Sequence, residues 1–336
     1  MRRGGFASCA LMLVAVLSVG AGAATAAPST GSSDGGAPGP SAPSKLQVVS
    51  SESLSPTRTA LFIDSPAMGR TVQVQLLQGR GTAPRPTVYL LDGLSSPAGD
   101  SDWIRKTDIE AFFANKPVNV VLPVGGEGTY YTDWARPDPR RGVNNWETFL
   151  TQELPDLIDS KFDGNGRNVI GGLSMGGQAA MTLITRHPDL YRGVVAFSTC
   201  PDLSEPNQRN LVRGAVASQG GDPTNMWGPE GDPLWSAHDP YLHAENLRGK
   251  TVLLTVGSGI PGIYDFGPNP DFPQSIVMGA PLENAAMLCT AKFKARLVAL
   301  DIPARVDFKP IGTHAWPYWQ DDLHDSWPTI ATALGL

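Results

Sequence analysis

The segment 172–176, which reads G-L-S-M-G, places the strongest constraint on how this chain can fold. It follows a short apolar run, 168–171, and precedes a segment with helical character, 177–186. In that context G-x-S-x-G is typical of a nucleophile elbow, a strand–turn–helix junction so tight that glycines must flank the serine. The junction holds the Oγ of Ser174 above the sheet, and the N–H of Met175 points to where an oxyanion would form. We therefore predict that Ser174 is a nucleophile, the alternative being a glycine-rich turn.

A serine of this kind needs a general base, and His314 is the best candidate. It follows a strand-like run, Arg305–Lys309, and a four-residue loop. In folds with this elbow the order along the chain is Ser, Asp or Glu, then His, which places the histidine after the last strand. His187 ends the segment after the elbow, where a histidine is usually structural. The remaining histidines lie in loop-like or polar segments: His238, His243 and His324.

The acidic partner of the histidine is left open by spacing alone. The strand-like run Thr251–Val256 ends at a Gly-Ser-Gly turn that has no carboxylate. Asp265, Asp271 and Glu283 all follow it. The two aspartates lie among Gly and Pro, as solvated loop carboxylates do. Glu283 starts a helical segment, where a carboxylate can also serve as a simple partner of the helix dipole.

Strand-like and helical segments alternate along the chain. The 336 residues are 41% hydrophobic and 17% charged, which suits one large domain with a sizeable core. The alternation predicts a mostly parallel central sheet with helices on both faces. Together with the nucleophile elbow, this indicates an α/β-hydrolase fold. The predicted strands are 72–77, 87–91, 118–122, 168–171, 193–197, 251–256 and 305–309. The predicted helices are 108–114, 146–161, 177–186, 283–300 and 323–334.

The N-terminal segment is predicted to be a secretory signal peptide, 1–27. Arg2 and Arg3 precede an apolar core, and Ala24-Thr25-Ala26 provides a small-residue cleavage site. A Pro/Ser/Gly-rich spacer is expected over 28–44 and the catalytic domain over 45–336. We expect a protein secreted to the cell envelope, with no transmembrane segment after cleavage of the signal.

Two further segments of the predicted domain stand out. The insert 201–247 is either a cap over the site or an irregular surface excursion. The Gly/Pro-rich segment 257–281 could form a flap over the site.

Charge and cysteine content indicate which ligands and which redox environment to expect for this protein. The formal net charge is −6, and the sequence has no cluster of basic residues of the kind that binds nucleic acid. We predict neither a metal ion nor a cofactor. After removal of Cys9 with the signal, Cys200 and Cys289 remain. An even pair in an exported protein suggests a disulfide, against two buried free thiols.

Several motifs together resemble the mycolyltransferases of mycolate-making actinobacteria, the antigen 85 group and its corynebacterial relatives. The resemblance covers about residues 50 to 330, in order and at similar spacing. The motifs are Y-L-L-D-G-L (89–94), L-P-V-G-G (122–126), W-E-T-F-L-T (146–151), G-L-S-M (172–175), M-W-G-P (226–229), L-E-N (282–284) and G-T-H-A-W (312–316).

The resemblance implies roles for particular residues. The glutamate of L-E-N is the triad acid in that family, which implies Glu283 here beside Ser174 and His314. The backbone N–H groups of Leu94 and Met175 would form the oxyanion hole. Two side chains would contact the sugar: Asp92 and Trp316.

This chain also departs from the family pattern. Ser95 stands where the family often has an arginine after D-G-L, and Ala285 stands where an aromatic residue is frequent. Segment 137–142 lacks the cysteine loop of the antigen 85 members. These departures favour the corynebacterial or nocardial branch.

The resemblance implies a secreted serine acyltransferase with a Ser-Glu-His triad. It would move mycolyl groups from trehalose monomycolate to a second trehalose monomycolate or to the arabinan of cell-wall arabinogalactan. The alternative is an exported carboxylesterase that hydrolyses acyl esters with the same triad. A third hypothesis is a non-enzymatic adhesin or scaffold, which the intact Ser, Glu and His set disfavours.

Overall fold

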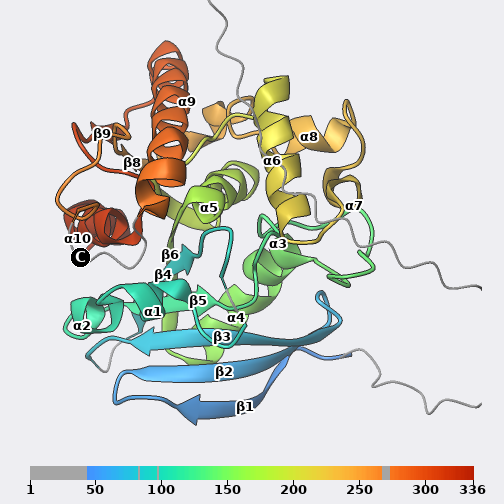
Figure 1. Ribbon diagram of the computed structural model, residues 1–336. Coiled ribbons are helices and arrows are strands. Elements are labelled where there is room, and N and C mark those ends of the chain that lie inside the picture. Colours follow the sequence, from blue (N-terminus) through green and yellow to red (C-terminus); the bar gives the residue numbers. More distant parts are fainter. Residues whose placement is uncertain (1–43, 82–83, 97, 267–272) are drawn as a thin grey trace, which may run out of the picture. The chain divides into compact units, whose positions relative to one another are not determined.

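A mostly parallel β-sheet forms the centre of the protein (Figure 1). The computed structural model describes residues 44–81, 84–96, 98–266 and 273–336. The predicted signal peptide, all of the predicted spacer except Ser44, and Asp271 lie outside the described residues. Strands in the described part are β1 (Gln47–Ser53), β2 (Arg58–Ser65), β3 (Arg70–Gln78), β4 (Arg85–Leu91), β5 (Asn119–Pro123), β6 (Gly164–Leu173), β7 (Tyr191–Phe197), β8 (Thr251–Val256) and β9 (Arg305–Phe308).

The strands of the described part join in the order β1-β2-β3-β5-β4-β6-β7-β8-β9. The pairs β1/β2, β2/β3 and β3/β5 are antiparallel. Every pair from β5 through β4, β6, β7 and β8 to β9 is parallel. The carboxyl ends of β4, β6, β7, β8 and β9 therefore meet at one edge of the sheet, where ligands bind in open α/β folds.

Helices connect the parallel strands and fill the insert between β7 and β8. They are α1 (Asp102–Lys106), α2 (Ile109–Phe113), α3 (Trp146–Thr148), the π-helix η1 (Phe149–Glu153), α4 (Leu154–Lys161), α5 (Ser174–Arg186), α6 (Pro206–Ser218), α7 (Pro223–Trp227), α8 (Pro233–Ala237), the 3₁₀-helix η2 (Ala244–Leu247), the π-helix η3 (Ser275–Gly279), α9 (Ala280–Ala299) and α10 (Trp316–Leu334).

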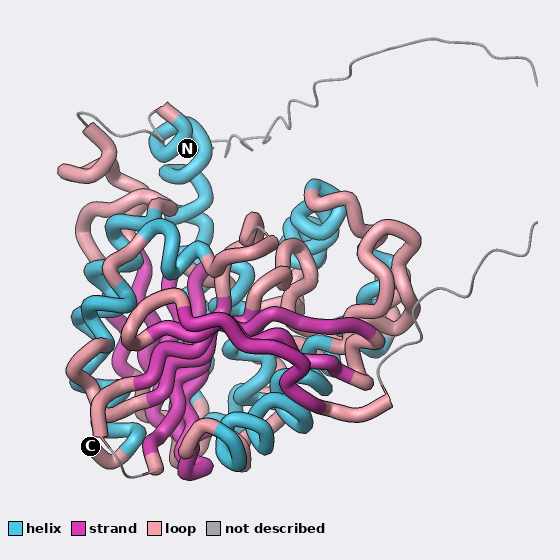
Figure 2. The backbone as a smooth tube through the Cα atoms, turned by 90° about the horizontal axis from the view of Figure 1, so that it is seen from below, coloured by secondary structure: helices cyan, strands magenta, loops and turns pink. Residues whose placement is uncertain are grey.

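Both faces of the parallel part of the sheet are buried beneath helices, as Figure 2 shows for the strands running between two groups of helices. Strand β4 is buried along its whole length. Because successive side chains of a strand point to opposite faces, Tyr89 and Leu91 belong to one hydrophobic cluster and Val88 and Leu90 to the other. The first cluster includes side chains of α4, α5 and α9, and the second includes side chains of α1, α2 and α10.

The predicted alternation of strands and helices is confirmed, with differences at particular elements. Strands β1 and β2 were not expected. Strand β1 is exposed along most of its length and lacks the apolar pattern of a core strand, whereas β2 does contribute Leu61 and Ile63 to the core. Helix α5 starts at Ser174 rather than 177, and α10 starts at Trp316 rather than 323. The insert 201–247 is largely helical, since it contains α6, α7, α8 and η2.

Among the described helices, none has both the length and the apolar character needed to cross a membrane.

Candidate active site

Ser174 lies where β6 turns into α5, as the elbow motif predicts. Its backbone φ is 51°, in the left-handed region that side chains other than glycine seldom adopt. The two glycines of the motif are needed for space. A Cβ on Gly172 would come within 2.6 Å of the Gly176 backbone, and one on Gly176 within 2.3 Å of the Asp92 carbonyl oxygen. The tight turn therefore packs directly on the end of β4.

His314 and Glu283 are brought together by loops and helices that are far apart in sequence. Glu283 lies in the first turn of α9, and His314 lies on the loop between β9 and α10. The His314 Nδ1 is 2.8 Å from the Glu283 Oε2. The glutamate is 1% exposed, whereas the histidine side chain keeps 14% of its surface exposed. A buried carboxylate that holds Nδ1 leaves Nε2 as the accessible ring nitrogen.

The second oxygen of Glu283 is also held. Its Oε1 accepts hydrogen bonds from the Ser198 hydroxyl at 2.7 Å and from the Gly257 N–H at 2.6 Å. The Ser198 Oγ in turn accepts a hydrogen bond from the Trp319 indole N–H at 2.8 Å. The Trp319 ring packs edge-on against the His314 ring, with centroids 4.8 Å apart. These contacts fix the glutamate and the imidazole in one arrangement.

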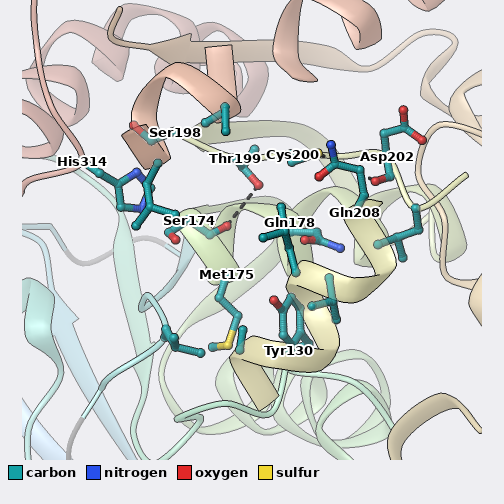
Figure 3. Close-up of a pocket in the computed structure, with 18 residues that line it drawn as sticks. Tyr130, Ser174, Met175, Gln178, Ser198, Thr199, Cys200, Asp202, Gln208 and His314 are labelled. Atoms are coloured by element: carbon teal, nitrogen blue, oxygen red, sulfur yellow. Dashed lines mark hydrogen bonds between the residues drawn. The ribbon is translucent and has the colours of Figure 1, made fainter. Parts of the chain in front are cut away.

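One cavity joins the serine and the histidine. It has a volume of about 840 Å³, including the part open to solvent. Ser174 and His314 lie at the same end of it (Figure 3). Leu94 and Met175, the two residues predicted to supply oxyanion N–H groups, line the cavity beside Ser174. The N–H groups of the first turn of a helix have no acceptor within that helix, so the N–H of Met175 is available at this position.

The walls of the cavity are largely apolar. Helix α6 contributes one wall and the start of α9 another, so part of the predicted insert does lie over the site. The apolar side chains that line it are Leu94, Met175, Leu203, Leu211, Val212, Ala215, Leu282, Ala285 and Ala286. A largely apolar cavity with a small number of polar groups suits a ligand with a hydrocarbon chain.

The chain matches proteins of one enzyme family over most of its length. A family model described as putative esterase matches residues 65–330. The diacylglycerol acyltransferase/mycolyltransferase Ag85A of Mycobacterium leprae (strain TN) is 33% identical over 284 residues, which is 82% of this chain and 83% of the relative. Ag85B of Mycobacterium avium is 33% identical over 283 residues, with the same coverage of both chains.

This chain belongs to the antigen 85 mycolyltransferase family.

Solved structures agree with the family assignment. The crystal structure of Mycobacterium tuberculosis MPT51 (FbpC1) matches with a TM-score of 0.70 and 27% identity, over 82% of this chain and 97% of that chain. An S-formylglutathione hydrolase from Agrobacterium tumefaciens matches with a TM-score of 0.63 at 18% identity, over 86% of this chain and 99% of that one. The fold is therefore the α/β-hydrolase fold, as predicted.

Asp92, the predicted sugar contact of the D-G-L motif, is buried and faces protein rather than the cavity. Its carboxylate accepts hydrogen bonds from the hydroxyls of Ser96 and Ser101 and from the N–H of Trp103. Burial raises the pKa of Asp92 to about 7, although these three donors lower it. In this structure Asp92 holds the loop that follows β4, and its contact with a sugar stays a prediction.

Trp316, the second predicted sugar contact, packs in an aromatic cluster. Its ring lies edge-on to Trp103 and to Trp319, with centroids 5.3 Å apart in each pair. Only 9% of its surface is exposed, and the Lys106 ammonium lies 5.3 Å from its ring centre. It does not line the cavity of Ser174, so its contact with a sugar also stays a prediction.

The predicted disulfide between Cys200 and Cys289 is present, with the Cα atoms 5.1 Å apart. Cys200 follows β7 and lines the cavity, and Cys289 lies on α9 beyond Glu283. A hydrogen bond from the Thr290 hydroxyl to the Thr199 carbonyl oxygen, 3.1 Å long, joins the same two segments. Helix α9 is thus fixed to the end of the strand that precedes the cavity.

The other candidate acid, Asp265, does not reach the imidazole. Its carboxylate accepts hydrogen bonds from the Thr313 hydroxyl at 2.5 Å, from the Tyr318 hydroxyl at 2.6 Å and from the Gly262 N–H at 2.8 Å. It is fully buried, not the solvated loop carboxylate that its Gly/Pro-rich surroundings predict.

The remaining histidines lie away from the cavity. His187 and His238 both face the buried carboxylate of Glu147, with nitrogen–oxygen distances of 2.6 Å and 3.4 Å. Arg186 also contacts Glu147, and these partners hold the pKa of the carboxyl well below its usual range against the opposing effect of burial. Within the described ranges, no three His, Cys, Asp or Glu side chains come together in a way that could hold a metal ion.

Sequence reasoning missed Ser198 and Gln178, which both line the cavity. Ser198 directly follows β7, next to the strand that carries the elbow, and its φ of 49° is as unusual as that of Ser174. A serine at the carboxyl end of a neighbouring parallel strand was a signal that could have been used. Gln178 is four residues after Ser174 and therefore shares a helix face with it.

Proposed function

We propose that this protein transfers a mycolyl group from trehalose monomycolate to a second trehalose monomycolate or to cell-wall arabinan, through an acyl-enzyme on Ser174. The observation that carries the proposal is the hydrogen-bonded pair of Glu283 and His314 at the same cavity as Ser174, in a chain of the mycolyltransferase family. The relatives are named diacylglycerol acyltransferase/mycolyltransferase, and of these two activities mycolyl transfer is the one proposed here.

The first half of the reaction forms the acyl-enzyme. The Ser174 Oγ attacks the ester carbonyl carbon while His314 Nε2 accepts the hydroxyl proton. The negative charge that develops on the carbonyl oxygen is stabilised by the N–H groups of Leu94 and Met175, each worth about 10²–10³ in rate. The bond to the sugar oxygen then breaks, and His314 returns the proton so that trehalose leaves as an alcohol.

The second half repeats these steps with a different nucleophile. A sugar hydroxyl attacks the acyl-enzyme and gives its proton to His314, and the Ser174 oxygen leaves and takes the proton back. Water in place of the sugar would give a free acid. Transfer therefore depends on a site that excludes water, and the apolar walls of α6 and α9 support this requirement.

Glu283 acts through His314. The imidazolium that forms in both steps gains stability from the carboxylate, and the donors Ser198 and Gly257 keep that carboxylate in place. The apolar cavity supports a long acyl chain as the transferred group, because hydrocarbon gains free energy when it leaves water for such walls.

The proposed location is outside the cytoplasmic membrane, in the cell envelope. The sequence pattern of residues 1–27 supports export, and the Cys200–Cys289 disulfide is typical of an oxidising compartment. Arabinogalactan is proposed as an acceptor on the family resemblance alone.

The deciding experiment is product analysis after incubation with a trehalose monoester labelled in its acyl chain. Transfer predicts labelled trehalose diester, and its yield should rise with added trehalose monoester as acceptor. An esterase of the alternative kind would produce labelled free acid at every acceptor concentration. The Ser174→Ala variant should produce neither.

A further inference from the structure

Gln178 lies inside the cavity, one helical turn beyond the proposed nucleophile. Both residues belong to α5, and residues four apart lie on the same helix face. Gln178 is 6% exposed, and Figure 3 shows its side chain extending into the space between α5 and α6. Its position is set by the same tight elbow that fixes Ser174.

The amide of Gln178 lacks a hydrogen-bond partner at one end. Its Nε2 is buried and, among the described residues, makes no hydrogen bond. An unmade hydrogen bond at a buried amide is costly, so buried polar groups are nearly always paired. An unpaired amide that lines a ligand cavity is explained most simply by a polar group of the ligand.

The position of Gln178 places its amide beside the path of an acyl chain. Gln178 and Ser174 line the same cavity, and Figure 3 shows the Gln178 amide pointing toward α6, on the side of the cavity away from His314. Four residues of helix span about 6 Å. An acyl group bound to Ser174 therefore has its first few carbon atoms within reach of the Gln178 amide.

The cavity wall facing this amide favours a hydrocarbon rather than a sugar. Helix α6 supplies Leu211, Val212 and Ala215 there beside one polar side chain, Gln208, and Leu203 lies just before the helix. A disaccharide has many hydroxyl groups, which such a wall would leave without partners. A fatty acyl chain with a single hydroxyl fits both the apolar wall and the one unpaired amide.

We propose that Gln178 binds the hydroxyl on the β-carbon of the acyl chain and makes the enzyme selective for 3-hydroxyacyl donors. A mycolyl group has a hydroxyl at this carbon, so the inference rests on the proposed function and extends it to the recognised part of the chain. The hydroxyl can accept from Nε2 and donate to Oε1, because an amide offers both roles.

The test compares two chromogenic esters on the same enzyme preparation, p-nitrophenyl 3-hydroxydecanoate and p-nitrophenyl decanoate, with each enantiomer of the first measured separately. The readout is the ratio of their kcat/KM values, followed by p-nitrophenolate release. A misfolded fraction lowers both rates equally and cancels in the ratio. For Gln178→Met, which keeps the length of the side chain but removes the amide, we expect the ratio to fall about three- to tenfold, as for one neutral hydrogen bond.

Gln208→Met is the matched control, because Gln208 lines the same cavity from α6. It should keep the wild-type ratio. A fall in the Gln208 variant with no change in the Gln178 variant would overturn the assignment, and so would an unchanged ratio in both.

A second arm separates the acyl hydroxyl from a sugar hydroxyl. If Gln178 bound the acceptor sugar, Gln178→Met would raise the KM for trehalose in acyl transfer and leave the ester ratio unchanged, which contradicts the proposal. The ester ratio does not require transfer to a sugar. A protein that only hydrolyses esters would therefore refute the proposed function while the role of Gln178 could still be measured.

Discussion

Glu283 and Asp265 are both buried beside the loop that carries His314, yet they hold different parts of it. Glu283 accepts a hydrogen bond from the imidazole itself, whereas Asp265 accepts from the hydroxyls of Thr313 and Tyr318. Their exposed fractions are 1% and 0%. Burial alone therefore does not distinguish an acid that acts on the histidine from one that positions the backbone.

The difference comes from the elements that support each carboxylate. Glu283 lies in the first turn of helix α9, which the Cys200–Cys289 disulfide fixes to the segment after β7. Asp265 belongs to the irregular segment after β8 and closes a short turn through the N–H of Gly262. The first carboxylate is held against the His314 imidazole by rigid structure, and the second joins two loops.

Removal of the proposed nucleophile gives the lowest rate with which both carboxylate variants are compared. Ser174→Ala should lower the rate of ester turnover by about 10⁶-fold, because the residues of a triad act as a unit. Ser174 is half-buried and its side chain contributes little to the core, so the thermal midpoint should stay close to that of the wild type. Residual turnover above a few per cent would identify another nucleophile.

Glu283→Gln should produce the larger loss of the two carboxylate variants. The amide cannot stabilise the imidazolium, and we expect turnover to fall about 10³- to 10⁴-fold. Steady-state rates with a chromogenic ester measure this. A loss of less than tenfold would show that the hydrogen bond to His314 is not used in catalysis.

Asp265→Asn should cost stability more than activity. An amide leaves at least one of the Thr313, Tyr318 and Gly262 donors unpaired, at a cost of about 1–3 kcal/mol in the free energy of unfolding. Turnover should fall less than about tenfold, because the imidazole keeps its partner. Denaturant unfolding and ester hydrolysis on the same sample test this, and a loss of turnover equal to that of Glu283→Gln would reverse the two roles.

The disulfide tests whether the rigid support of Glu283 matters. The double variant Cys200→Ala, Cys289→Ala removes a crosslink between residues 89 apart in sequence. The free energy of unfolding should fall by about 2–4 kcal/mol, while turnover at 25 °C should change less than about threefold. The fall in turnover should grow on warming well below the thermal midpoint, as α9 loosens. A temperature dependence equal to that of the wild type would exclude such a role.

Asp92 is a third buried carboxylate. Its replacement should change the pH dependence of the free energy of unfolding more than it changes turnover. Its pKa is raised by burial to about 7, above about 3.9 in an unfolded chain. Between these values the folded state binds more protons, so the free energy of unfolding falls as pH rises from about 4 to about 7 and levels off above. Thermal midpoints at pH 5 and pH 8 should differ less in Asp92→Asn than in the wild type. Asp239 and Asp322, whose pKa values are raised to about 6, contribute equally in both proteins.

The sequence by itself determined the elbow and the alternation around it. Glycines at 172 and 176 and a serine between them can be read directly, because only glycine fits where the structure leaves no space for a Cβ. His314 was likewise indicated by local order, since it follows the last predicted strand. These features depend on residues that are close together in the chain, so they can be predicted from the local sequence.

Spacing along the chain could not decide which carboxylate faces the imidazole, whereas the tertiary structure shows the contact directly. Asp265 and Glu283 are both acidic residues between β8 and β9, and their spacing from His314 left the choice open until the family resemblance was considered. The same holds for Asp92, where the motif implied a sugar contact and the folded chain buries the carboxylate. The donors that hold a buried carboxylate come from segments distant in sequence, so their identity appears only once the chain has folded.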